Sequence, residues 1–134
     1  MSSGGWLAVG CVALGGGLGA VLRYGVGLLA ARVSPAVLGG WPVATFAVNL
    51  VGSFLIGLLV GGLLARLPAS DAMRGFLLTG LLGGFTTFSA FSLELGEMAL
   101  HKQYGLALGY GGLSVFGGVG AFLLGMWLVR GLAP

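Results

Sequence analysis

Four long apolar stretches, separated by short polar connections, constrain the fold more than any other feature of the sequence. Charged residues make up 7% of the chain and the mean hydropathy is +1.09. A water-soluble domain typically carries about 25% charged residues, so this chain has too few to cover a water-facing surface. A bilayer core needs about 20 apolar residues for each helical span. The sequence therefore predicts an all-α membrane protein with four transmembrane helices and no soluble domain.

The expected spans form one transmembrane domain over residues 1–134, and they cover residues 6–33, 43–64, 73–100 and 106–129. Strands are not expected, because the stretches are long, do not alternate, and are rich in Ala, Leu and Gly. Pro68 and Asp71 predict a turn before the third span, with Asp71 as its N-cap. The first apolar stretch is too long for a signal peptide and lacks a basic start, so we interpret it as a true span.

Small residues recur at a spacing that favours close helix packing. Helices in lipid associate through backbone contact, which small residues four positions apart permit. The 29 glycines include three such pairs: Gly15 with Gly19, Gly57 with Gly61, and Gly105 with Gly109. We expect these helices to pack tightly, in a bundle or against a partner chain.

The basic residues barely distinguish the two sides of the membrane. Lys and Arg in the connections normally set orientation. Here one side carries three and the other two, with Arg23 inside the first span: Arg66, Arg74 and Arg130 against Arg32 and Lys102. This balance is compatible with insertion in both orientations and an antiparallel dimer, and also with one orientation fixed by a partner or a single charge. Basic residues scattered in this way do not form a nucleic-acid-binding patch.

Polar residues inside the spans follow helical spacing. Thr45, Asn49 and Ser53 form one stripe on the second span, and Tyr110 and Ser114 share a face of the fourth. Intramembrane polar groups are costly and often functional, although hydrogen bonding between helices is the simpler explanation.

Acidic residues are few, which excludes several functions. Glu94 and Glu97 lie near the end of the third span, where Glu94 is expected as a helix-end carboxylate near the membrane surface. No residues have the spacing of a metal site or a nucleophile–base set, so we do not expect an enzyme. A pathway lined by neutral hydrogen-bond donors remains, and such a lining suits an anion that must shed water.

The segment GGFTTFSAFS, residues 83–92, interrupts the third span. Non-helical backbone at membrane depth is tolerated only where it is buried in protein or lines a wet cavity. Gly83 and Gly84 are the expected break point, and a break frees carbonyls that can hold a cation. Phe88 and Phe91 share a face of the second half-helix, where their electropositive edges could meet an anion; simple packing is the alternative.

Three stretches resemble the Fluc, or CrcB, family of fluoride channels: GGGLGAVLRYGVG (15–27), FAVNLVGSFLIGLL (46–59) and GLLGGFTTFSAFS (80–92). The third is the most specific, with its paired glycine, Thr-Thr-Phe-Ser and second phenylalanine. The resemblance implies an antiparallel, dual-topology homodimer in the bilayer of the cell (inner) membrane. It also implies two pores at the subunit interface, through which fluoride leaves the cytoplasm passively.

The resemblance further implies site residues. Phe88 and Phe91 would meet the ion with their ring edges, and Asn49 would donate its side-chain amide. Other positions of the implied fluoride pathway are Thr87, Ser89, Tyr110, Ser114 and Arg23. The carbonyls of Gly83 and Thr86, from both subunits, would hold a structural sodium ion at the dimer centre.

Two positions depart from the family pattern. Gly118 stands where a further hydroxyl of the fourth span can occur, so that polar track is either shorter or completed by water. Ala90 replaces the commoner Thr or Ser between the two phenylalanines.

Two other functions fit the sequence less well. A small dual-topology multidrug or proton-coupled exporter shares the size and charge balance, but that class resembles proteins with an essential carboxylate in the first span, and this first span has none. A non-conducting assembly subunit predicts neither a polar stripe nor a helix break.

Overall fold

The structure, a computed structural model, describes residues 3–32, 41–66 and 69–131. Its elements are α1 (Ser3–Arg32), α2 (Val43–Leu58), the π-helical η1 (Leu59–Leu63), α3 (Leu64–Arg66), α4 (Asp71–Arg74), the π-helical η2 (Gly75–Leu82), α5 (Gly83–Phe85), α6 (Phe88–Leu100) and α7 (Tyr104–Gly131). They make four helices long and apolar enough to cross a membrane: Gly4–Arg32, Val43–Gly62, Asp71–Leu100 and Tyr104–Gly131. The prediction of an all-α protein with four spans is confirmed.

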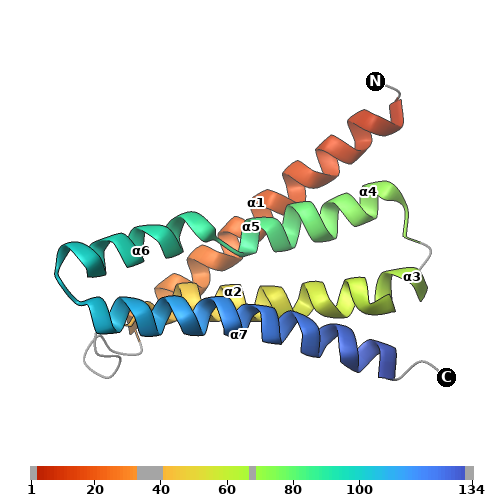
Figure 1. Ribbon diagram of the computed structural model, residues 1–134. Helices are drawn as coiled ribbons and strands as arrows, with labels where there is room; N and C mark the ends of the chain where they lie inside the picture. Colours follow the sequence, from red (N-terminus) through yellow and green to blue (C-terminus); the bar gives the residue numbers. More distant parts are fainter. Residues whose placement is uncertain (1–2, 33–40, 67–68, 132–134) are drawn as a thin grey trace.

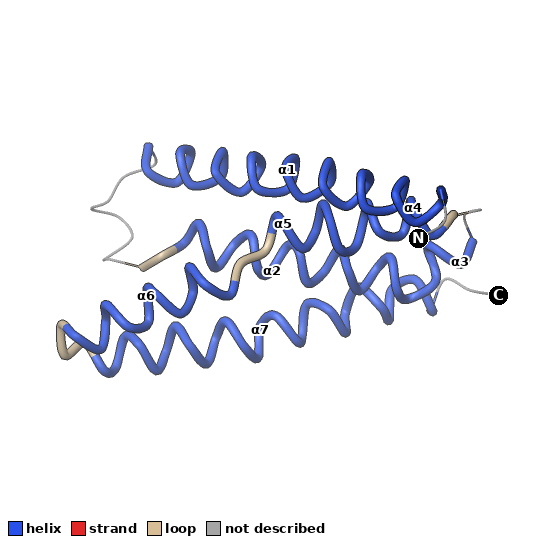
Figure 2. Tube along the Cα trace, turned by 90° about the horizontal axis from the view of Figure 1, so that it is seen from above, coloured by secondary structure: helices blue, strands red, loops and turns tan. Residues whose placement is uncertain are grey.

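The four spans form two packed pairs. α2 lies along α7, and α1 lies against η2 and α5 of the third span. Figure 1 shows α1 crossing the third span at an angle, while α2 and α7 run side by side. Figure 2 shows that α6 continues the third span beyond a short non-helical link, on the side of α7.

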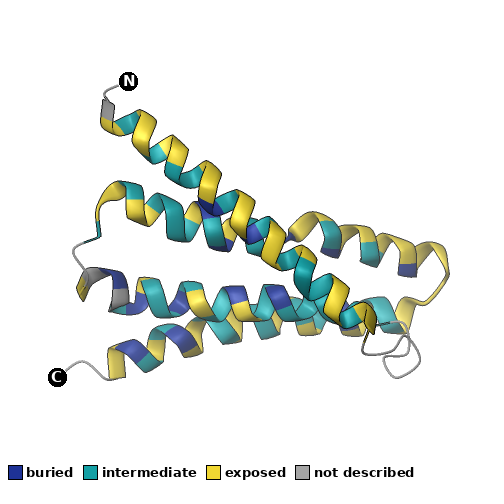
Figure 3. Ribbon diagram, turned by 180° about the vertical axis from the view of Figure 1, so that it is seen from behind, coloured by how far each residue is buried: buried dark blue, intermediate teal, exposed yellow. Residues whose placement is uncertain are grey.

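Many large apolar residues of this bundle are exposed, and Figure 3 shows exposed residues along the outer faces of the spans. Leu108 and Phe116 on α7 are 78% and 81% exposed. In water so much apolar surface would drive association. In a bilayer it can face lipid or another transmembrane chain.

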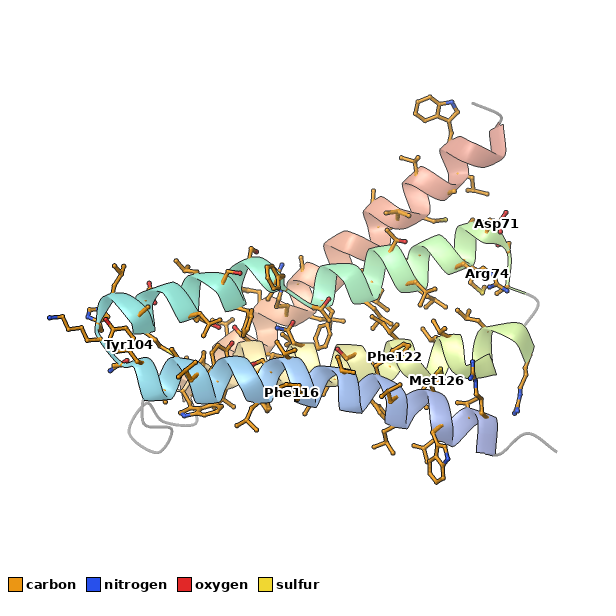
Figure 4. The ribbon with its side chains drawn as sticks, in the orientation of Figure 1. Asp71, Arg74, Tyr104, Phe116, Phe122 and Met126 are labelled. Carbon is orange, nitrogen blue, oxygen red and sulfur yellow. The ribbon has the colours of Figure 1, made fainter. Side chains whose placement is uncertain are left out.

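Glycines make the contacts between the paired helices. A Cβ added to Gly15 would lie 2.8 Å from the amide N of Leu81, and one added to Gly19 would lie 2.7 Å from that of Phe85. Gly57 and Gly61 pack in the same way on the α7 backbone at Phe122 and Met126, both labelled in Figure 4. The close packing predicted for these two pairs is confirmed.

The third predicted pair behaves differently. A Cβ added to Gly105 or Gly109 would have no described atom within 4 Å. The predicted close packing is therefore not seen within the part of the chain that the structure describes, and for this pair it stays a prediction about a partner chain.

Replacing Gly19 by Ala should destabilise the protein, because its methyl group would collide with backbone that cannot rotate away. Overpacking of this kind costs about 1–3 kcal/mol. Thermal unfolding in detergent should show a lower midpoint for Gly19→Ala than for Gly17→Ala, whose added Cβ would meet nothing within 4 Å. Equal midpoints would contradict the close approach of α1 to the third span.

The helix boundaries differ from the expected ones in detail. Ser70, and not Asp71, is the N-cap of α4: its side chain accepts a hydrogen bond from the backbone N of Met73 at 3.2 Å. Asp71 is the first helical residue, where its negative charge interacts favourably with the positive end of the helix dipole.

The second span ends in a bend at Gly62, whose φ of 142° is accessible mainly to glycine. Val33 and Pro68, used to predict boundaries, lie outside the described residues.

Candidate functional site

The third span is broken at two threonines. Thr86 (φ −82°, ψ 159°) and Thr87 (φ −152°, ψ 121°) are extended, between α5 and α6. The break falls within the expected range, but its expected position at Gly83 and Gly84 is wrong, since both glycines are helical. Gly84 instead allows contact with α1, because a Cβ there would lie 3.0 Å from Cα of Gly16. β-branched threonine suits extended backbone.

Asn49 on α2 holds the break with both atoms of its side-chain amide. Nδ2 donates to the carbonyl of Thr87 at 3.0 Å, and Oδ1 accepts from the Thr87 N–H at 2.7 Å. Thr87 then caps α6, because its Oγ1 accepts from the N–H of Ala90 at 3.2 Å. Backbone that leaves a helix inside a membrane needs such partners. This clamp was not predicted, although Asn49 carries the only side-chain amide within the expected spans.

The carbonyls of Gly83 and Thr86 are among those that the break removes from helical pairing. In an uninterrupted helix, the carbonyls of Gly83 and Thr86 would accept from the N–H groups of Thr87 and Ala90. Those N–H groups bond to Asn49 Oδ1 and Thr87 Oγ1 instead. Carbonyl oxygens without a helical donor are suitable ligands for a hard cation. Among the described residues, no three His, Cys, Asp or Glu side chains form a metal-binding group.

Arg23 reaches the break from α1. Its Nε donates to the carbonyl of Gly84 at 3.2 Å. The side chain also lines a cavity of about 320 Å³ together with Tyr24, Thr45 and Thr87. A guanidinium stays charged in proteins, so it makes this cavity attractive to anions.

A second cavity, of about 380 Å³, lies between α2, α6 and α7, and we call it the central groove. Its polar and aromatic lining comprises Asn49, Ser53, Phe88, Phe91 and Ser114, with Gly118 beside them. Four residues of the predicted pathway therefore share one cavity: Asn49, Phe88, Phe91 and Ser114. The remainder of the lining is aliphatic apart from the ring of Phe122 on α7 (Figure 4).

The two phenylalanines of the central groove differ in exposure. Phe91 is 7% exposed and Phe88 is 78% exposed. Their ring centroids lie 5.7 Å apart with planes tilted by 48°, so the rings are not stacked face to face. Beside them the Oγ of Ser114 is buried and has no hydrogen-bond partner among the described residues. The groove therefore has a buried hydroxyl next to aromatic rings.

Glu94, expected as a helix-end carboxylate near the membrane surface, makes hydrogen bonds to two other spans. Its Oε1 accepts from Thr45 Oγ1 at 2.5 Å, and its Oε2 accepts from the Tyr110 hydroxyl at 2.6 Å. The cluster ties α2, α6 and α7 together behind Phe91, whose ring centroid lies 5.3 Å from that of Tyr110. The three-residue spacing from Phe91 to Glu94 places both on one helix face. This spacing could have predicted from the sequence that Glu94 lies on the same side of the helix as Phe91.

Tyr110→Phe should lower stability, because it removes the donor to one oxygen of Glu94 while Tyr110 is fully buried. A buried acceptor left without its partner costs about 1–3 kcal/mol. The measurement is the thermal unfolding midpoint in detergent, with Tyr104→Phe as the matched control, since Tyr104 is 61% exposed. A Tyr110→Phe midpoint as high as that of the control would argue against the cluster.

The other predicted pathway residues do not line the central groove. Tyr110 lies behind Phe91. Ser89 is exposed, and its Oγ lies 3.2 Å from Thr87 Oγ1. Thr87 and Arg23 line the cavity on the α1 side. The arrangement is thus two cavities on either side of the Asn49–Thr87 clamp, one beside a positive charge and one lined by neutral donors and rings.

Comparison with known proteins identifies relatives over most of the chain. Residues 10–126 match the family described as "CrcB-like protein, Camphor Resistance (CrcB)". A protein of Hyphomonas neptunium is 51% identical over 120 residues, 89% of this chain and 92% of the relative. A protein of Novosphingobium aromaticivorans is 47% identical over 123 residues, with 91% and 95% covered. One of Chloroflexus aurantiacus is 44% identical over 119 residues, with 89% and 92% covered. All three carry the name "Fluoride-specific ion channel FluC".

Proposed function

Because the chain belongs to the CrcB-like family and is a multi-pass protein of the cell membrane, we propose that it is a fluoride-selective channel that passively exports fluoride from the cytoplasm. The names of its relatives support the substrate. The observation that carries the proposal is the central groove, in which the amide of Asn49, the hydroxyl of Ser114 and two phenylalanine rings share one cavity.

The lining of the central groove favours a small anion over a cation. Amide and hydroxyl hydrogens and the edges of aromatic rings all carry partial positive charge. Both oxygens of Glu94 already accept hydrogen bonds, from Thr45 and Tyr110. Proton-coupled exporters usually rely on an intramembrane ionisable group, so the clustered Glu94 favours a passive channel over the exporter alternative.

The direction of transport follows from acid–base chemistry. Hydrogen fluoride crosses membranes as a neutral acid, dissociates in the less acidic cytoplasm and is trapped as the anion. A membrane potential supplies about 2.3 kcal/mol per charge per 100 mV. A fluoride-selective leak would therefore lower the internal concentration without any other energy source.

We propose that two copies pair as an antiparallel homodimer with dual topology and form two pores at their interface. The exposed ring of Phe88, beside the open groove, would then be covered by the partner. Gly105 and Gly109, which have no close contact within the described chain, are available for another helix. The nearly equal basic charge on the two sides permits both orientations.

A structural sodium ion at the dimer centre is also proposed. The carbonyls of Gly83 and Thr86, whose helical donors are directed elsewhere at the break, would hold it, and the bound cation would supply positive charge between the two breaks. Asn49 and Thr87 would orient these carbonyls by fixing the extended backbone.

The test is ion efflux from liposomes that contain the purified protein. A potassium gradient with valinomycin supplies the driving force, and a fluoride electrode reports release. We expect fast fluoride efflux, no chloride efflux in a parallel sample, and no need for a proton gradient. Well-folded protein that releases no fluoride would contradict the proposal, as would release that requires a proton gradient.

A further inference from the structure

We propose that Ser53 is a further anion-binding residue, whose hydroxyl donates a hydrogen bond to fluoride at the level of Gly118. The inference rests on the proposed function and deepens it, by extending the donor lining of the central groove beyond Asn49 and Ser114. It assigns a role to the last member of the Thr45–Asn49–Ser53 stripe, for which hydrogen bonding between helices was the simpler explanation.

Ser53 lies in the wall between two cavities. It lines the central groove, and it also lines a neighbouring cavity of about 220 Å³ together with Thr86 and Thr87 at the break. Asn49 and Phe88 line both cavities as well. Four residues of α-helix rise about 6 Å, so the Ser53 hydroxyl is the next polar group along this face of α2 after the Asn49 amide.

Gly118 leaves space for that hydroxyl on the opposite side of the groove. A Cβ added to Gly118 would lie 3.6 Å from the Oγ of Ser53. α7 therefore presents no side chain at this level, and Ser53 faces its backbone. One turn earlier, α7 presents the buried hydroxyl of Ser114. The two helices thus supply hydroxyls in turn, Ser114 from α7 and then Ser53 from α2.

Beyond Ser53 the lining of the central groove becomes apolar, with Ile56, Val119 and Phe122. An anion that moved from Asn49 toward these side chains would lose its hydrogen bonds in an apolar environment, which is strongly unfavourable. A hydroxyl donor at this boundary keeps the ion solvated, and hydrogen bonds to an ionised acceptor are the strong ones. Ser53 is placed to be that donor.

Three substitutions at Ser53 distinguish hydrogen bonding by its hydroxyl from the space that its side chain fills. Ser53→Ala should slow fluoride efflux from liposomes about tenfold, the effect of losing one hydrogen bond to a charged group. Ser53→Cys should show a similar loss, because a thiol is a weak donor of similar shape. Ser53→Thr keeps the hydroxyl and should conduct at a rate close to that of the unaltered protein.

A double substitution moves the hydroxyl across the groove. Gly118→Ser in the Ser53→Ala background has space for its Cβ, which would meet the position of Ser53 Oγ at 3.6 Å, and it should restore most of the lost efflux. Thr79→Ala is the matched control: this hydroxyl is exposed on η2 and lines none of the cavities named above. It should leave efflux unchanged.

Efflux in Ser53→Ala equal to that of the unaltered protein would overturn the assignment. A loss that Gly118→Ser does not repair, in protein of unchanged thermal stability, would also overturn it, since Ser53 would then act through packing. Absence of fluoride efflux from the unaltered protein would instead contradict the proposed function, so the two failures are distinguishable.

Discussion

Asn49→Asp is expected to abolish fluoride efflux from liposomes at neutral pH. The substitution puts a negative charge on the wall of the central groove, where it would repel an entering anion. Two unit charges about 4 Å apart interact by about 4 kcal/mol at an effective dielectric constant of about 20, which corresponds to about a thousandfold in rate. It also replaces the Nδ2 donor to the Thr87 carbonyl by an oxygen, so the clamp on the break is weakened.

Asn49→Ala separates these two effects, because it removes the clamp and the donor without adding charge. Its efflux should fall below that of the unaltered protein and remain above that of Asn49→Asp. The thermal unfolding midpoint of Asn49→Ala reports on the clamp without the effect of an added charge. Fluoride flux in Asn49→Asp as fast as in the unaltered protein would show that this side chain faces away from the ion.

Phe88→Ile and Phe91→Ile should each reduce fluoride efflux sharply, by about tenfold or more, because an aliphatic side chain has no electropositive ring edge to offer the ion. Phe88 is the cleaner test. It is 78% exposed within the single chain, so its replacement should disturb the packing of the four spans very little. Phe91 is buried against Tyr110, and its replacement should lower both efflux and stability.

Phe116→Ile is the matched control for Phe88→Ile. Phe116 is 81% exposed on α7 and does not line the central groove; it is labelled in Figure 4. Its replacement should leave efflux unchanged. Unaltered efflux in both Phe88→Ile and Phe91→Ile would remove the rings from the mechanism.

The four spans and two of their glycine contacts could be predicted from sequence because hydropathy and small-residue spacing are local properties. The position of the break could not. Gly83 and Gly84 look like breaking residues, but α1 packs on Gly84, and both glycines stay helical. The extended residues are Thr86 and Thr87, and Asn49, far away in sequence, holds Thr87 in that conformation.

For a similar reason, some features of the candidate site could be predicted from sequence and others could not. Residues on one helix face, such as Phe88 and Phe91, were correctly placed together. The hydrogen-bond partners of Glu94 were not predicted, because its position near a helix end does not reveal them. Thr45 and Tyr110 come from two other helices, and the packing of α2 and α7 against α6 is not encoded in any single span.

The most direct test of a passive fluoride pathway is the reversal potential of the current through a planar bilayer that contains the protein. With a tenfold fluoride gradient, we predict a reversal potential of about 59 mV, with the sign expected for an anion. Neither a chloride gradient nor a pH gradient should move it. A reversal potential that follows chloride or pH, or a fluoride gradient that gives no current, would contradict the account.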